Sequence, residues 1–229
     1  TSVLYGLAVD LGSTTVVLQL VDCHTGKLLT QESVRNHQRD KGLEILSRIF
    51  YTKDRPDHLE ELRLLTLKSI LEGMENIKKR TDIDVFQCGA MVISGNNAMI
   101  HFLTGLDPLP IFASPYAVWA DQLGFCPASD LELPLSCPVY LVPARANYLG
   151  GDIISGLMDV NIQEKEGIQA FFDVGTNGEL VIGNRDFLLC GAGAAGPALE
   201  GGAVRTGMRA AEGAVTQVRL NHGEFTLTV

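Results

Sequence analysis

The chain carries one short construction twice, and this repeat constrains its fold more than any other feature. An apolar run ends at Asp10, passes through Gly12 and becomes apolar again, and a second run does the same through Asp173 and Gly175. Each copy predicts a strand, a tight turn and an antiparallel partner strand. Two such units far apart in the sequence predict a fold with two similar parts.

The segments between the two copies alternate between strand and helix patterns. A third strand is predicted to end at Val34, which makes the first copy part of an antiparallel meander. Apolar residues at helical spacing predict helices over 41–50 and 57–79. The other predicted elements are a strand over 85–94, a turn at 95–97 entering a helix, a proline-rich loop over 108–115, a strand over 137–144, a helix over 150–160, and strands over 168–174, 179–182 and 187–190.

Composition and charge exclude several classes of protein. Hydrophobic residues make up 46% of the chain and charged residues 20%, so a packed core is expected. The net charge of −9, without basic clusters, argues against nucleic-acid and anionic-membrane partners. No apolar run is long enough to span a bilayer, and the first residues resemble a strand more than a basic leader, so we expect a cytoplasmic protein. The five cysteines lack C-x-x-C spacing, which predicts scattered reduced thiols.

The two turns have the chemistry of a phosphate site. Glycine lets the backbone approach an anion closely, and the N–H groups and hydroxyls that follow can donate to phosphate oxygens. An aspartate at the strand end can hold Mg²⁺ through water. Either turn alone is also an ordinary hairpin. Two such turns facing each other would grip phosphates from both sides of a cleft.

The turn sequences AVDLGSTTVVLQL and FFDVGTNGELVIG resemble the two phosphate motifs of the actin, Hsp70 and sugar-kinase ATPase superfamily. Three further stretches, ISGNNAMIHFLTGLDP, PARANYLGGDIISGL and CGAGAAGPALEGG, narrow this resemblance to the reductive activators of corrinoid proteins, an iron–sulfur family with an ATPase module. The resemblance covers nearly the whole chain. It implies an α/β fold, with a ribonuclease H-like mixed sheet and flanking helices over 1–165, the start of a second similar domain over 166–229, and a nucleotide between them.

The resemblance also implies a function. In that family, ATP hydrolysis helps to drive an unfavourable electron transfer that restores Co(I) in an inactivated corrinoid protein. The implied cofactors are ATP and Mg²⁺, the implied partner is a corrinoid protein, and a homodimer is compatible with it. A [2Fe–2S] cluster is expected only in a cysteine-rich domain before Thr1, and the adenosine-binding part is expected beyond Val229.

Carried over residue by residue, the resemblance implies that Asp10 and Asp173 are catalytic and that both hold Mg²⁺ through water. The phosphate-binding residues that it implies are Gly12, Ser13, Thr14 and Thr15 in the first turn and Gly175, Thr176, Asn177 and Gly178 in the second. Further candidates are Glu179, which either positions water or metal or merely begins a strand, Asn96, which either lines the cleft or only forms a turn, and Gln38.

Three other stretches receive mixed interpretations. Gly150-Gly151-Asp152 is interpreted as a plain helix start with Asp152 as its cap. GAGAAGPALEGG lacks the G-K-[ST] of a P-loop and is interpreted as a packing or partner-facing turn. VRNHQRDKGLEILSRI matches a family segment at Asn36, Gln38 and Gly42 but has Glu44 at the acidic position, which leaves a catalytic role for that carboxylate unsupported.

Three functions therefore stay open at this point. The first is an ATPase module, whose nucleotide binding would depend on Asp10. The second is a non-catalytic docking or assembly fragment that binds a corrinoid protein without nucleotide. The third is a small-molecule kinase of the same superfamily, which the lack of a convincing substrate-base carboxylate in the sequence disfavours.

Overall fold

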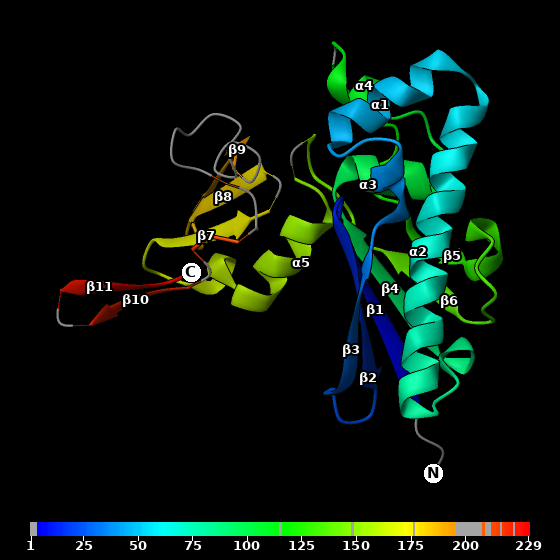
Figure 1. Cartoon of the computed structure of the whole chain (residues 1–229), viewed down its shortest axis with the longest axis horizontal. Coiled ribbons are helices and arrows are strands. Elements are labelled where there is room, and N and C mark those ends of the chain that lie inside the picture. The colour runs from blue at the N-terminus through cyan, green and yellow to red at the C-terminus, as the bar shows by residue number, and fades with distance from the viewer. Residues whose placement is uncertain are drawn as a thin grey trace.

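The computed structural model describes residues 4–114, 116–147, 149–175, 177–195, 208, 212–215, 217–221 and 223–229. Its largest part is a six-stranded sheet with the order β3-β2-β1-β4-β6-β5 (Figure 1). The strands are β1 (Tyr5–Leu11), β2 (Thr15–Asp22), β3 (Lys27–Arg35), β4 (Ala90–Gly95), β5 (Gly124–Pro127) and β6 (Pro138–Leu141).

The sheet joins an antiparallel meander to parallel strands. β1 pairs antiparallel with β2, and β2 with β3, while β1, β4 and β6 run parallel. β5 closes the sheet as an antiparallel edge strand beside β6. The hairpins follow the tight turns that the sequence predicts, and the parallel pairs are connected through helices. This arrangement confirms the predicted ribonuclease H-like mixed sheet.

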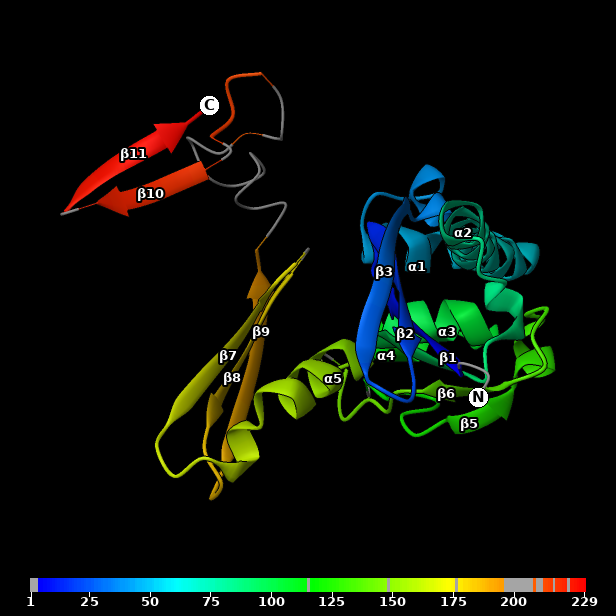
Figure 2. The ribbon, with the colours of Figure 1, turned by 90° about the horizontal axis from the view of Figure 1, so that it is seen from below.

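Five α-helices are described, and most of them lie on one side of the sheet. They are α1 (Ile45–Asp54), α2 (Asp57–Thr81), α3 (Asn97–Thr104), α4 (Leu109–Phe112) and α5 (Gly151–Val160). Figure 2 shows α2 and α3 beside the six-stranded sheet and α5 leading away from it toward the yellow strands. None of the helices in the described ranges combines the length and apolar character that crossing a bilayer needs.

The main core lies between the sheet and α2. Alternate strand residues point to opposite faces, so Leu7, Val9 and Leu11 of β1 all point to the α2 side and are buried. α2 approaches closely at Gly73, where an added Cβ would lie 2.3 Å from a methyl carbon of Leu18. The opposite face of β1, which carries Ala8 and Asp10, is therefore left for the candidate site.

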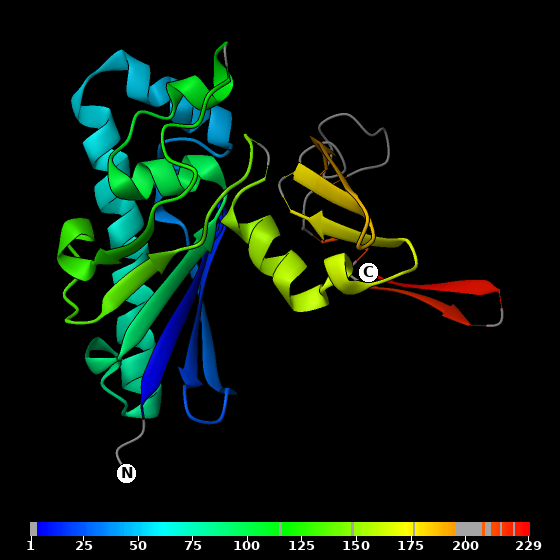
Figure 3. The same cartoon turned by 180° about the vertical axis from the view of Figure 1, so that it is seen from behind.

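A second, antiparallel sheet follows α5 in the chain. It has the order β7-β8-β9, with β7 (Gln169–Val174), β8 (Asn177–Gly183) and β9 (Leu188–Ala194). α5 lies between the two sheets (Figure 3), and an added Cβ at its Gly156 would lie 2.5 Å from the ring of Phe171 in β7. A further hairpin joins β10 (Gln217–Asn221) to β11 (Glu224–Thr228). The three predicted strands of the second repeat are confirmed.

Several predicted boundaries were wrong for identifiable reasons. The helix predicted from Lys41 begins at Ile45, because the backbone first forms a 3₁₀ turn over His37–Asp40 and Glu44 then caps α1. The strand predicted over 85–94 begins at Ala90, after a 3₁₀ turn over Val85–Gln87. The proline-rich loop contains the short helix α4, which begins directly after Pro108. β5 was missed, since a four-residue edge strand has too little alternation to detect.

Candidate functional site

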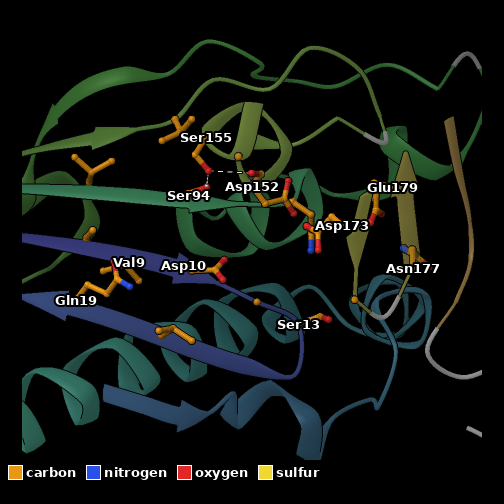
Figure 4. Close-up of a pocket in the computed structure, with 18 of the residues that line it drawn as sticks. Val9, Asp10, Ser13, Gln19, Ser94, Asp152, Ser155, Asp173, Asn177 and Glu179 are labelled. Carbon is orange, nitrogen blue, oxygen red and sulfur yellow. Dashed lines mark hydrogen bonds between the residues drawn. The ribbon is translucent and has the colours of Figure 1, made fainter. Parts of the chain in front are cut away.

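The two repeated turns lie on opposite walls of one cavity of about 780 Å³ (Figure 4). Asp10, Gly12 and Ser13 line it from the first sheet, and Asp173, Gly175 and Asn177 line it from the second. Asp10 is directly beside Ser94 in the parallel register of β1 and β4. Both motifs therefore end at the same cavity, although they are far apart in sequence.

The first turn is tight enough to require glycine at its centre. A Cβ added at Gly12 would lie 2.4 Å from the carbonyl oxygen of Thr15, closer than real Cβ atoms approach. Ser13 is nearly buried and lines the cavity. Thr14 and Thr15 are exposed and are not part of the cavity wall. The backbone of the turn, more than its threonine side chains, faces the cavity.

The second turn is closed by its own backbone. The N–H of Gly175 donates to the carbonyl of Asn177 over 2.8 Å, and Thr176, between them, is outside the described residues. Gly178 serves packing, because a Cβ there would lie 3.1 Å from the ring of Phe172. Asn177 and Glu179 line the cavity, so alternate residues at the start of β8 face it.

Four carboxylates line this cavity, one each from β1, α5, β7 and β8. Burial raises the pKa of Asp10, and the negative charge of Asp173 raises it further. Burial raises the pKa of Asp152 to about 6, with smaller contributions from Asp173 and Asp10. The pKa of Glu179 is raised by burial and then by Asp152 and Asp173. The cavity therefore has a strongly negative wall and favours the binding of a cation.

Asp152 is a site residue that the sequence analysis missed. The predicted cap was wrong: Gly150 is the N-cap of α5, and the Asp152 Oδ1 accepts the N–H of Ile153 over 2.9 Å. A Cβ at Gly150 would lie 2.5 Å from Asn96 Cα, and one at Gly151 would lie 2.7 Å from the Val142 carbonyl oxygen. The two glycines let α5 begin against the sheet, which puts Asp152 in the cavity beside Asp10. The only sequence signal was an Asp after a Gly-Gly pair.

The further candidates occupy different places. Asn96 lines the cavity and also caps α3, because its Oδ1 accepts the N–H of Met99 over 3.0 Å. Gln38 is fully buried behind the first turn and does not line the cavity. Glu44 is exposed at the start of α1, where it forms a capping box with Ser47. The stretch GAGAAGPALEGG begins within β9, which ends at Ala194. Most of the rest of the stretch lies outside the described residues.

A second cavity of about 350 Å³ adjoins the first. It shares four polar residues with the larger cavity, namely Asn96, Asp152, Asn177 and Glu179. Its other walls are mostly apolar side chains from α1, α3 and α4, among them Leu46, Ile49, Ala98, Ile111 and Phe112. The carboxylates of Asp152 and Glu179 therefore lie between a polar cavity and a largely apolar one.

The donor set of the cavity fits one kind of metal. Across the described residues, no three His, Cys, Asp or Glu side chains come close enough to hold an ion directly. The available donors are carboxylate, hydroxyl and amide oxygens. Mg²⁺ keeps several waters and needs only one or two carboxylates, so this set fits Mg²⁺ held through water.

Comparisons with known proteins found two matching family models and a similar solved structure. A family model described as the RACo middle region matches residues 5–165, and a model described as the C-terminal domain of RACo, the ASKHA domain, matches residues 167–229. A solved structure titled "Reductive activator for corrinoid,iron-sulfur protein" has 36% sequence identity and a TM-score of 0.85, and the similarity covers 99% of this chain and 37% of that one.

Two curated proteins are also similar. The "Corrinoid activation enzyme RamQ" of Eubacterium limosum is 32% identical over 234 residues, which cover 99% of this chain and 38% of that protein. The "[Co(II) methylated amine-specific corrinoid protein] reductase" of Methanosarcina barkeri is 26% identical over 231 residues, which cover 94% of this chain and 41% of that protein. The chain thus spans about two fifths of the length of these relatives.

Proposed function

Because the chain belongs to the RACo family, we propose that it is an ATP-binding module that couples ATP hydrolysis to the reductive reactivation of a corrinoid protein. The observation that carries this proposal is the shared cavity: two equivalent Asp-x-Gly turns from two sheets line it together. Its volume of about 780 Å³ is within the usual range of small-molecule sites. We further propose that 1–165 and 166–229 act as two units that close on the nucleotide.

The proposed roles follow from position. The backbone around Gly12 and Ser13 binds phosphate oxygens from one wall, and the turn around Gly175 and Asn177 binds them from the other. Asp10 and Asp173 would hold Mg²⁺ through water, and the ion, when bound, would offset the negative charge of the phosphates and the carboxylates.

Asp152 is the strongest candidate for activating the attacking water. A general base works best when its pKa is near the operating pH, and the pKa of Asp152 is raised to about 6. Glu179 has a raised pKa and lines the same wall, so it can orient the same water. Asp152 also lies in the first turn of α5, near the positive end of the helix dipole.

Calorimetric titration of Mg-ATP into the protein encoded by the complete gene tests the binding step. We expect Asp10→Asn to weaken binding at least tenfold, because it removes a carboxylate that holds the ion. Asp159→Asn, at the exposed end of α5, is the matched control and should bind like the wild type. Unchanged binding by Asp10→Asn, or no binding by the wild type, would refute the proposal.

The coupling step needs a separate experiment. The protein is mixed with a Co(II) corrinoid protein and a low-potential reductant, and formation of Co(I) is followed by its absorption spectrum. We expect reduction to require Mg-ATP and to be lost with Asp173→Asn. Reduction that proceeds equally without nucleotide would favour a docking role for the chain over an ATPase role.

The second cavity gives one reason to test a kinase activity as well. It holds space for a small acceptor molecule beside Asp152 and Glu179, which could serve as the substrate base that the sequence did not reveal. Transfer of labelled phosphate from ATP to a panel of small acids and sugars distinguishes the two functions. Phosphorylation of any acceptor faster than hydrolysis would favour the kinase.

A further inference from the structure

The family-like segment 34–49 is organised around one buried arginine. Arg48 of α1 is fully buried, as are Asn36 and Gln38. Its Nε donates to the carbonyl of Gly42 over 2.9 Å, and its Nη1 donates to the Oε1 of Gln38 over 3.0 Å. The residues that matched the family segment are therefore neighbours in one network, and that network has no side chain in the wall of the main cavity.

This network holds the first turn from behind. The Nη2 of Arg48 donates to the carbonyl oxygen of Ser13 over 2.5 Å. Asn36 holds the residues on either side: its Nδ2 donates to the carbonyl of Gly12 over 2.8 Å, and its backbone N–H donates to that of Thr14 over 3.0 Å. Three consecutive carbonyls of the turn thus bond to the segment that contains Asn36 and Arg48.

These bonds determine the direction of the N–H groups. In a trans peptide unit the C=O and the following N–H point in opposite directions. Since the carbonyls of Gly12 and Ser13 point back to Asn36 and Arg48, the N–H groups of Ser13 and Thr14 point away from them. Gly12 and Ser13 line the cavity, whereas Asn36 and Arg48 do not. The buried side chains therefore orient the backbone donors of the turn.

The charge of Arg48 has no described counter-ion. Burial and the nearby Arg39 lower its pKa to about 10, so it stays protonated at neutral pH, and no described carboxylate contributes to that pKa. Arg39 adds a second positive charge, and its buried Nε has no hydrogen-bond partner among the described atoms. An uncompensated buried cation is costly for a folded protein unless something nearby offsets it.

We propose that Arg48 is a positioning residue for the phosphates: it orients the first turn and supplies positive potential through it to an anion in the cavity. This inference rests on the proposed function. This role of Arg48 explains why a cavity with four carboxylates can bind a highly charged anion. The positive charge of Arg48 lies behind the turn, where it does not contact the carboxylates. Mg²⁺ and Arg48 would then act on the phosphates from different sides.

The test compares three variants of the complete protein by calorimetric titration with Mg-ATP. We expect Arg48→Gln, which keeps hydrogen-bond donors but removes the charge, to weaken binding roughly tenfold. Arg48→Lys loses the planar fork of donors but keeps the charge, so it should bind within about threefold of the wild type if the charge is the main contribution. Gln38→Met is the matched control: it disturbs the same buried network but leaves the Arg48–Ser13 bond and the charge, and it should change affinity less than about twofold.

The salt dependence of affinity separates charge from structure. Loss of a cation near the site should make the Mg-ATP affinity of Arg48→Gln less sensitive to ionic strength than that of the wild type. Equal affinity of Arg48→Gln and wild type would overturn the inference, as would equal losses in all three variants. If Arg48→Gln does not fold, weak binding by folded Arg48→Lys overturns it. A wild type that does not bind Mg-ATP overturns the proposed function instead.

Discussion

Replacing Asp152 by Asn is expected to stabilise the protein in the absence of nucleotide and metal. At neutral pH the native state holds Asp152 ionised in a partly buried place near Asp10 and Asp173, and both burial and the like charges disfavour the ionised form. Asn removes the charge and can still accept the N–H of Ile153, which the carboxylate accepts now. The substitution therefore removes a cost and keeps the local geometry.

The magnitude follows from the pKa. A rise from 3.8 to about 6 corresponds to about 3 kcal/mol at full strength. Remaining solvent contact and rearrangement of the neighbouring charges reduce this, so we expect Asp152→Asn to gain about 1–2 kcal/mol at pH 7.5. Enzymes often hold such unfavourable groups at their functional sites.

The sign of the pH dependence is unusual for a carboxylate. Because the native pKa is raised, the native state binds the proton more tightly than the unfolded state. The contribution of Asp152 to wild-type stability is fully present below about pH 4 and is lost as the pH rises through about 6. The advantage of Asp152→Asn should therefore shrink to about 0.5 kcal/mol at pH 4.5.

Urea denaturation at pH 4.5 and 7.5, in metal-free buffer, measures both effects. Asp159→Asn changes an exposed carboxylate at the other end of the same helix and controls for the general effect of removing a charge. The reasoning is refuted if Asp152→Asn is no more stable than wild type at pH 7.5. It is also refuted if the difference between them is the same at both pH values.

Two other predictions concern packing and thiols. Gly150→Ala should lose about 1–3 kcal/mol of unfolding free energy in urea, because its Cβ would lie 2.5 Å from Asn96 Cα. The control Gly191→Ala, whose Cβ would have no atom within 4 Å, should lose less than about 0.5 kcal/mol. Equal losses in the two variants would contradict the close contact at Gly150. In Ellman's assay at pH 8, the exposed Cys23 and Cys190 should react within minutes. The buried Cys88 and Cys137 should react only after denaturation, and burial also raises the pKa of Cys88 to about 12. Rapid labelling of all thiols would contradict the burial of Cys88 and Cys137.

The sequence predicted the elements whose signal is local. The strands around Asp10 and Asp173 were predictable because an apolar run, an Asp-x-Gly turn and a second apolar run are enough to specify a hairpin. α2 was predictable because a long helix repeats its apolar spacing many times. The family resemblance, which the match to the RACo family confirms, then supplied the arrangement of the sheet.

Contacts between distant segments could not be predicted in the same way. Asp152 follows a Gly-Gly pair that looks like an ordinary helix start, and its place beside Asp10 depends on how closely α5 approaches Asn96 and Val142. Arginine is a residue type that is almost never fully buried, yet Arg48 is, because Ser13 of the first turn and Gln38 and Gly42 of its own segment offer it acceptors. The local spacing of residues predicts neither the place of Asp152 nor the burial of Arg48.

Helix α5 has a consequence for motion. Its ten residues make a rod about 15 Å long. At its start, the N-cap Gly150 lies against Asn96 and Gly151 lies against Val142, the residues that follow β4 and β6. Gly156, further along α5, lies against Phe171 of β7. Phe171, the contact of Gly156, is two residues before Asp173, and Gly150 is two residues before Asp152. Tilting this rod would move the carboxylate of one wall relative to that of the other, so the width of the cavity and the angle of α5 form a single mechanical variable.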